Sequence, residues 1–253
     1  MTEDTFISHL VELRDRLLRS LIAVGIVFAC LFPFSSELYD LVAHPMMQAL
    51  QPGTKMLATG VISPFLIPVK VALMAAFAIA LPYVLYQAWA FVAPGLYSHE
   101  KRLVVPLVVA STLLFFVGVA FCYFFVFGVV FDFVNKIAPQ SITVAPDIEN
   151  YLNFVLTMFL AFGVTFEVPI VVLILARMGV VTIEQLATFR PYFIVGSFVI
   201  AAVVTPPDVI SQLLLAIPMC LLYELGILCA RIFVKPRPAE PGDVIERESG
   251  GGS

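Results

Sequence analysis

Two carboxylates, Glu12 and Glu100, lie in settings that suit the binding of a cationic ligand. Glu12 belongs to an amphipathic N-terminal segment, and Glu100 to the charged tetrad His99–Arg102 between two long apolar runs. If both face the same water, they could bind guanidinium groups through charge-assisted hydrogen bonds worth about 1.5–3 kcal/mol each. Arginine would suit such a site better than lysine, because its planar guanidinium matches a carboxylate. Taken alone, each residue is more typical of a solvated surface.

Glu167 is an acidic residue in the middle of a long apolar run. An acidic side chain at the centre of a bilayer costs roughly 2.5–3.5 kcal/mol on insertion scales, and such residues normally face a bundle interior or water. A functional role is therefore the favoured interpretation. The alternative is a protonated, hydrogen-bonded structural glutamate beside a helix kink at Pro169.

Two further polar residues, Thr205 and Gln212, flank the break between the last two apolar runs. They could form capping or packing hydrogen bonds within this hairpin. They could equally form a docking contact for another membrane helix that carries a polar residue.

Motifs of enzymes and metal sites are absent from the sequence. The 3 histidines are far apart, and the 4 cysteines fall in apolar runs without metal-binding spacing, so we expect the cysteines to be small buried hydrophobic residues. No phosphate-binding loop, nucleophile elbow or zinc-peptidase motif occurs. The net charge of −4 gives no indication of nucleic-acid binding. We therefore expect no enzymatic activity, cofactor or metal.

The composition is that of an integral membrane protein, with 61% hydrophobic and 13% charged residues. We predict one all-α membrane domain over residues 1–233. It begins with an interfacial helix that runs into the first span. Residues 234–253 are expected to form a disordered cytoplasmic tail, whose final Gly-Gly-Gly-Ser has the composition of an appended linker. The six predicted spans cover approximately residues 17–34, 69–92, 107–130, 151–176, 192–204 and 209–233.

The last two predicted spans are short. The fifth has about 13 residues after a polar turn over 177–191, which is roughly 20 Å of helix against a hydrocarbon core of about 30 Å. Such a hairpin should thin the bilayer or lie behind neighbouring helices.

Lysine and arginine are unevenly distributed between the predicted loops. They concentrate in the N-terminal segment, the 91–106 loop, the 177–191 turn and the tail, whereas the opposite loops carry only Lys55 and Lys136. The positive-inside rule therefore predicts that both termini and the 91–106 loop face the cytoplasm.

Several motifs together resemble the TatC family, the polytopic receptor of the twin-arginine protein export system. The residues that carry this resemblance are HLVELRDRL near the start, SPF at 63–65, YQAWAFVAPGLYSHEKR at 86–102, FGVTFEVP at 162–169, RPY at 190–192 and TPPDVISQ at 205–212. The resemblance covers about residues 6–233, and the predicted topology agrees with that family's fold.

The resemblance implies a concave six-helix receptor in the bacterial cytoplasmic (inner) membrane. It would bind twin-arginine signal peptides of folded proteins and self-associate into a multimeric complex. With the single-span proteins TatB and TatA, it would mediate export driven by the proton-motive force. The implied signal-peptide site comprises Glu12, Arg14, Phe91, Glu100 and Lys101.

The resemblance implies roles for other positions too. Glu167 would be a carboxylate on the concave face, Thr205 and Gln212 would contact TatA or TatB, and Pro45 would matter in the first external loop. Gly60 departs from the pattern, because some relatives carry an acidic residue there.

Three other functions are weaker interpretations of the same residues. A proton- or ion-coupled transporter would fit Glu167 and the short hairpin, but no internal repeat is detectable. A membrane-embedded enzyme would need a nucleophile and base or a metal cluster. A purely structural assembly factor would leave Glu12 and Glu100 unexplained.

Overall fold

The fold consists entirely of helices in the part of the chain that the structure describes. This computed structural model describes residues 3–49, 57–92, 104–137, 147–205 and 208–234. Its helical elements are α1 (Glu3–Leu31), a 3₁₀ turn (Phe32–Phe34), α2 (Ser35–Ala49), α3 (Ser63–Val92), α4 (Val104–Phe121), a π turn (Cys122–Val126), α5 (Phe127–Ile137), α6 (Ile148–Phe166), α7 (Val168–Arg177), α8 (Ile183–Val204) and α9 (Val209–Phe233). The predicted tail lies outside the described residues.

The prediction of six membrane-crossing segments is confirmed. Within the described ranges, 6 helical segments are long and apolar enough to cross a bilayer: Ile7–His44, Ser63–Val92, Val104–Phe133, Ile148–Arg177, Ile183–Val204 and Val209–Phe233. Large apolar side chains are exposed on all of these segments, as expected for surfaces that face lipid.

The start of the fifth segment differs from the prediction. Helix α8 begins at Ile183 rather than near residue 192, because Thr182 and Gln185 form a reciprocal capping box. The expected polar turn over 177–191 is therefore wrong, and Pro191 lies inside the helix. The helix of 22 residues is not short, although its first turns are polar and its apolar part still begins near Tyr192.

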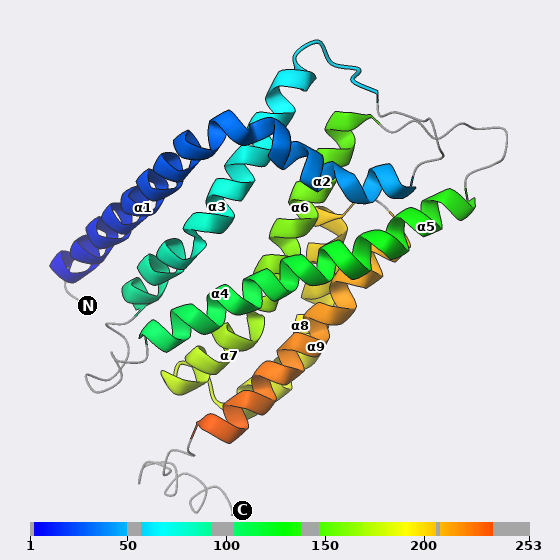
Figure 1. Cartoon of the computed structure of the whole chain (residues 1–253). Coiled ribbons are helices and arrows are strands. Elements are labelled where there is room, and N and C mark those ends of the chain that lie inside the picture. The colour runs from blue at the N-terminus through cyan, green and yellow to red at the C-terminus, as the bar shows by residue number, and fades with distance from the viewer. Residues whose placement is uncertain (1–2, 50–56, 93–103, 138–146, 206–207, 235–253) are drawn as a thin grey trace, which may run out of the picture.

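Other helices also extend beyond the predicted apolar spans. Helix α3 begins at Ser63, with Pro64 in its first turn, where the missing N–H of proline costs nothing. Asp132, expected in a loop, lies in α5. A further helix, α2, lies between the first two predicted spans, and it bends away from α1 after the turn that contains Pro33 (Figure 1).

The helices pack in an order that places α1 at one edge and the α8–α9 hairpin at the other. Helix α1 packs mainly on α3, α3 packs on α4, α4 on α6, and α7 and α8 on α9. One buried core joins α3, α4, α5, α6 and the hairpin, and a smaller one joins α7, α8 and α9. Helix α1 begins and α9 ends at the same end of the bundle (Figure 1).

Two glycines allow helices to approach closely. A Cβ atom at Gly163 of α6 would overlap the ring of Phe115 of α4, and one at Gly226 of α9 would lie 3.0 Å from Cα of Pro169 in α7. These contacts fix α6 and α7 against their neighbours, and thereby the position of the Glu167 break between them.

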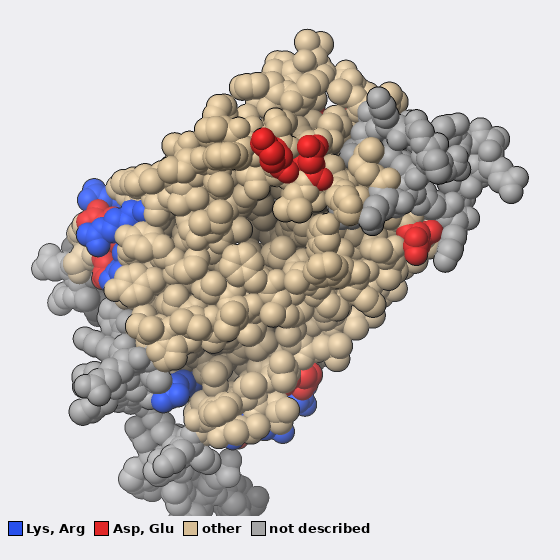
Figure 2. Space-filling model, in the orientation of Figure 1, with Lys and Arg blue, Asp and Glu red and all other residues tan. Residues whose placement is uncertain are grey.

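Charged side chains gather near the two ends of the bundle on the face shown in Figure 2. Lys and Arg lie mainly at the end where α1 begins, and a broad band without charged residues separates them from acidic side chains near the other end. At the first end, Arg190 of α8 binds Glu224 of α9 through Nε–Oε1 and Nη2–Oε2 contacts of 2.7 and 2.8 Å. This ion pair uses both carboxylate oxygens and ties the hairpin together.

The expectation of buried cysteines holds only for Cys122. Cys30 is exposed on α1, and Cys220 and Cys229 are half-buried on α9. Apolar runs in a membrane protein face lipid as well as the core, so hydropathy alone does not predict burial.

Candidate functional site

The first part of the candidate site lies where α1 packs on the end of α3. The two helices run antiparallel, because successive contacts pair rising residue numbers on α1 with falling numbers on α3. His9 stacks on Phe91, with ring centroids 4.2 Å apart and an interplanar angle of 22°. The structure therefore brings the predicted site residue Phe91 to the N-terminal segment.

Glu12 lies one turn along α1 from His9 and binds Arg16. Nε and Nη2 of Arg16 donate to Oε1 of Glu12 at 2.9 and 2.7 Å, and Nη1 donates to Oε1 of Gln87 on α3 at 3.2 Å. Glu12 and Arg16 are partly exposed, whereas Gln87 is only 5% exposed. The Glu12 cluster, defined here as His9, Glu12, Arg16, Gln87 and Phe91, thus contains a guanidinium held between a carboxylate and a buried amide.

The other predicted signal-peptide residues are not part of these contacts. Arg14 donates to Oδ1 of Asp15 at 2.8 Å, and its side chain is 67% exposed. Glu100 and Lys101 lie outside the described residues, so their place relative to Glu12 stays a prediction.

Glu167 lies at the break between α6 and α7, as the sequence predicts. The helix path continues through it, because its carbonyl accepts from Ile170 N and Val171 N at 3.0 Å. Its carboxylate oxygens are buried and have no hydrogen-bond partner within the described residues. The hydroxyl of buried Ser111 lies next to this carboxylate, and it also accepts from Nε1 of Trp89 at 3.0 Å. Both interpretations of Glu167, the functional one and the structural one, therefore stay predictions.

Thr205 and Gln212 both form hydrogen bonds within the α8–α9 hairpin. Thr205 is buried and its Oγ1 donates to Ala201 O at 2.8 Å, while Nε2 of Gln212 donates to Phe198 O at 3.2 Å. These are the capping and packing bonds that the sequence left open. A docking role for these residues stays a prediction.

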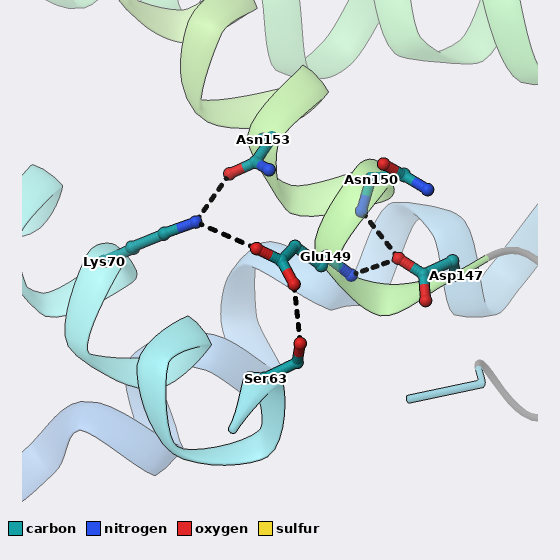
Figure 3. A network of polar contacts seen from close by, with 6 residues as sticks. All are labelled: Ser63, Lys70, Asp147, Glu149, Asn150 and Asn153. Atoms are coloured by element: carbon teal, nitrogen blue, oxygen red, sulfur yellow. Dashed lines mark hydrogen bonds and ion pairs between the residues drawn. The ribbon is translucent and has the colours of Figure 1, made fainter. Parts of the chain in front are cut away.

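A second polar cluster ties α3 to α6 at the other end of the bundle (Figure 3). The Ser63 hydroxyl donates to Oε2 of Glu149 at 2.6 Å, and Lys70 Nζ donates to Oε1 of Glu149 at 3.4 Å and to Oδ1 of Asn153 at 3.1 Å. We define the Glu149 cluster as these four residues together with Thr59 and Asp147.

Asp147 is the N-cap of α6 and also binds the segment before α3. Its Oδ1 accepts from Glu149 N and Asn150 N, and its Oδ2 accepts from the hydroxyl and N–H of Thr59. The Thr59 hydroxyl bond, followed by the backbone bonds, lowers the pKa of the Asp147 carboxyl. Leu57 O adds a backbone bond from Ile148 N of 2.8 Å.

Two predicted positions of the first external loop lie in or near these elements. Pro45 belongs to α2, and its side chain is outside the described part. A Cβ atom at Gly60 would overlap the Ser63 hydroxyl and would lie 3.6 Å from Oε2 of Glu149. The carboxylate at this corner is therefore supplied by α6 rather than by residue 60.

The described residues contain no group of three or more His, Cys, Asp or Glu side chains that could hold a metal ion. The Glu12 cluster is built from a carboxylate, an amide, a guanidinium and two aromatic rings, and its carboxylate and amide can bind a cation.

Sequence reasoning missed Arg16, Gln87 and the Glu149 cluster. The i,i+4 spacing of Glu12 and Arg16 predicts their ion pair, and the amide of Gln87 in an apolar span could have marked it. Nothing in the sequence pairs Gln87 with α1, or Lys70 with α6, because both contacts are tertiary.

Comparisons with known proteins agree with this arrangement. Residues 8–218 match the family model described as "Sec-independent protein translocase protein (TatC)". The chain is 52% identical over 234 residues to the TatC protein of Haemophilus influenzae, covering 92% of this chain and 91% of that protein. It is 50% identical over 234 residues to the TatC protein of Escherichia coli, with the same coverage of 92% and 91%.

A solved structure gives the same result for the fold. The crystal structure of the twin-arginine translocase receptor TatC superposes with a TM-score of 0.80 at 41% identity, covering 90% of this chain and 100% of that one.

Proposed function

This chain belongs to the TatC family of Sec-independent protein translocase proteins, and we propose that it is the receptor for twin-arginine signal peptides. Family membership makes it a multi-pass protein of the bacterial inner membrane and a translocase component rather than an enzyme. The proposal adds the ligand and the site that binds it.

The observation that carries the proposal is the guanidinium held by Glu12 and Gln87 at the α1–α3 contact. At this contact, Glu12 and Gln87 already bind one arginine side chain, that of Arg16. A signal-peptide arginine would bind through the same two groups. Glu100, Lys101 and Arg14 would complete the site from the 91–106 loop and from α1, with Phe91 as its aromatic wall.

The site should face the cytoplasm. The start of α1 and the end of α9 lie on the side of the bundle that carries most of the Lys and Arg residues seen in Figure 2, in agreement with the positive-inside rule (Figures 1 and 2). An N-in, C-in topology would present Glu12 to signal peptides before export.

The remaining parts of the proposal concern partners and energy. The receptor would self-associate and bind the single-span proteins TatB and TatA, with transport driven by the proton-motive force. Glu167 is a carboxylate without a partner among the described residues inside the bundle, which suits a polar contact with an entering helix. Thr205 and Gln212 would contribute to the TatA/TatB surface.

Peptide binding tests the receptor assignment. The full chain in lipid nanodiscs should bind a signal peptide with Arg-Arg before its apolar run at least about tenfold more tightly than its Lys-Lys version. Equal binding of the two peptides would contradict the proposal. Glu100→Ala should weaken crosslinking to the Arg-Arg peptide without loss of folding.

Partner docking is tested separately. Gln212→Leu should reduce co-purification and crosslinking with TatB, while signal-peptide binding stays normal. Normal TatB contacts in this variant would remove the hairpin from the docking surface.

A further inference from the structure

We propose that Arg16 occupies, in the free receptor, the subsite that a signal-peptide arginine takes when it binds. Glu12 and Gln87 form this subsite, and Arg16 is an internal competitor that the peptide must displace. The proposal rests on the proposed receptor function and adds to it two residues, Arg16 and Gln87, that the predicted signal-peptide site does not include.

The subsite is defined by two acceptors at guanidinium spacing. One Arg16 side chain reaches Glu12 through Nε and Nη2 and Gln87 through Nη1. Gln87 is almost fully buried, so its carbonyl oxygen is costly to leave without a donor. Any arginine that replaces Arg16 would satisfy the same acceptors, whereas water would have limited access to Gln87.

The Glu12–Arg16 pair is arranged for exchange. Both Arg16 bonds end on Oε1 of Glu12, so the pair does not use Oε2. The Arg190–Glu224 pair, by contrast, uses both carboxylate oxygens and joins two helices. The Glu12 side chain is also 37% exposed, so a ligand guanidinium can approach this side chain before Arg16 leaves.

The geometry discriminates against lysine. A guanidinium presents its donors in a fixed plane and can bridge a carboxylate and an amide carbonyl together. An ammonium is a point charge that lacks this fork, so a lysine peptide would gain less from displacing Arg16. Competition by Arg16 therefore increases the difference in affinity between arginine and lysine peptides.

Competition has a measurable consequence. When a site is filled by an internal group, the apparent dissociation constant rises in inverse proportion to the open fraction. A partly exposed ion pair within one helix fills its site only modestly. Removing Arg16 should therefore tighten binding of the Arg-Arg peptide by about two- to sixfold, whereas removing Gln87 should weaken it by about three- to tenfold.

The experiment measures Arg-Arg and Lys-Lys peptide affinities for the full chain in nanodiscs. The variants are Arg16→Gln, Gln87→Met and Arg19→Gln; the last removes the same charge one turn farther along α1. The proposal predicts tighter Arg-Arg binding in Arg16→Gln, weaker binding in Gln87→Met and unchanged binding in Arg19→Gln. Unchanged or weaker Arg-Arg binding in Arg16→Gln overturns the internal-competitor role.

A second readout follows the displacement of Arg16 directly in the wild-type chain. In the ¹⁵N-labelled wild-type chain, the Arg16 Nε–H signal, assigned by its absence in Arg16→Gln, should shift when the Arg-Arg peptide is added. A signal that stays unchanged at saturating peptide overturns displacement while the receptor function stands. Equal binding of the Arg-Arg and Lys-Lys peptides to the wild type overturns the receptor function itself, and this proposal with it.

Discussion

The Glu12 cluster and the Glu149 cluster lie at opposite ends of the bundle, and each is built around a glutamate. The two glutamates differ in the helices that their hydrogen bonds join. Glu12 binds an arginine of its own helix through one oxygen, and a single amide links that arginine to α3. Glu149 binds Ser63 and Lys70 through different oxygens, beside a capped helix end that also holds Thr59 (Figure 3).

This difference separates a site for exchange from a structural clasp. A loosely held guanidinium can be replaced by a ligand without separating two helices. The Glu149 cluster joins the segment before α3, α3 itself and α6, so opening it would separate elements far apart in the chain. We therefore expect substitutions in the first cluster to change binding, and those in the second to change stability.

Glu12→Gln should have the largest effect. Losing the charged acceptor should weaken Arg-Arg peptide binding about tenfold or more, because hydrogen bonds to a charged group contribute about 1.5–3 kcal/mol. The melting temperature should change little. Titration calorimetry and thermal unfolding measure the two quantities. Glu224→Gln removes another arginine-paired carboxylate and should leave peptide binding unchanged. Equal losses of peptide affinity in both variants would show that the effect is not specific to the Glu12 cluster.

Ser63→Ala should show the opposite pattern. Removing the buried hydroxyl that donates to Glu149 should destabilise the protein by about 1 kcal/mol, with peptide affinity unchanged. Thermal unfolding in nanodiscs would detect the shift. Thr188→Ala is the matched control, since its exposed hydroxyl donates to Glu184 O within α8. A normal melting temperature in Ser63→Ala would show that the Glu149 cluster is not a clasp.

Asp147 should give the smallest, pH-dependent effect. Its pKa is lowered in the folded chain by the bond from Thr59, so the ionised cap stabilises the fold above the unfolded pKa of about 4. This contribution is lost as the pH falls through the lower folded value. Asp147→Asn can still cap α6 but carries no charge. The difference in melting temperature between wild type and Asp147→Asn should be present at pH 7 and shrink below about pH 4; a constant difference would contradict it.

The sequence predicts the number of spans because long apolar runs in a membrane protein have few alternatives. Its errors lie at helix ends, because α8 begins at Ile183 and α3 at Ser63, both before the predicted apolar spans. Capping by Thr182 decides the first of these, and hydropathy does not detect caps.

The candidate site was predicted only in part. Phe91, which the family resemblance implied, stacks on His9 of α1, and Glu12 binds Arg16 at the same α1–α3 contact. Glu167, which stands out as an acidic residue in an apolar run, lies where α6 meets α7. Gln87 and Arg16 were missed because their significance depends on which helix lies opposite. The same holds for Glu149, whose partners Ser63 and Lys70 belong to a distant segment.

The most direct test of this account is the ratio of Arg-Arg to Lys-Lys peptide affinity in wild type, Glu12→Gln and Ser63→Ala. The account predicts a ratio of about tenfold or more in the wild type and in Ser63→Ala, and a ratio near one in Glu12→Gln. An unchanged affinity ratio in Glu12→Gln would contradict the claim that the Glu12 cluster recognises the arginines of the signal peptide.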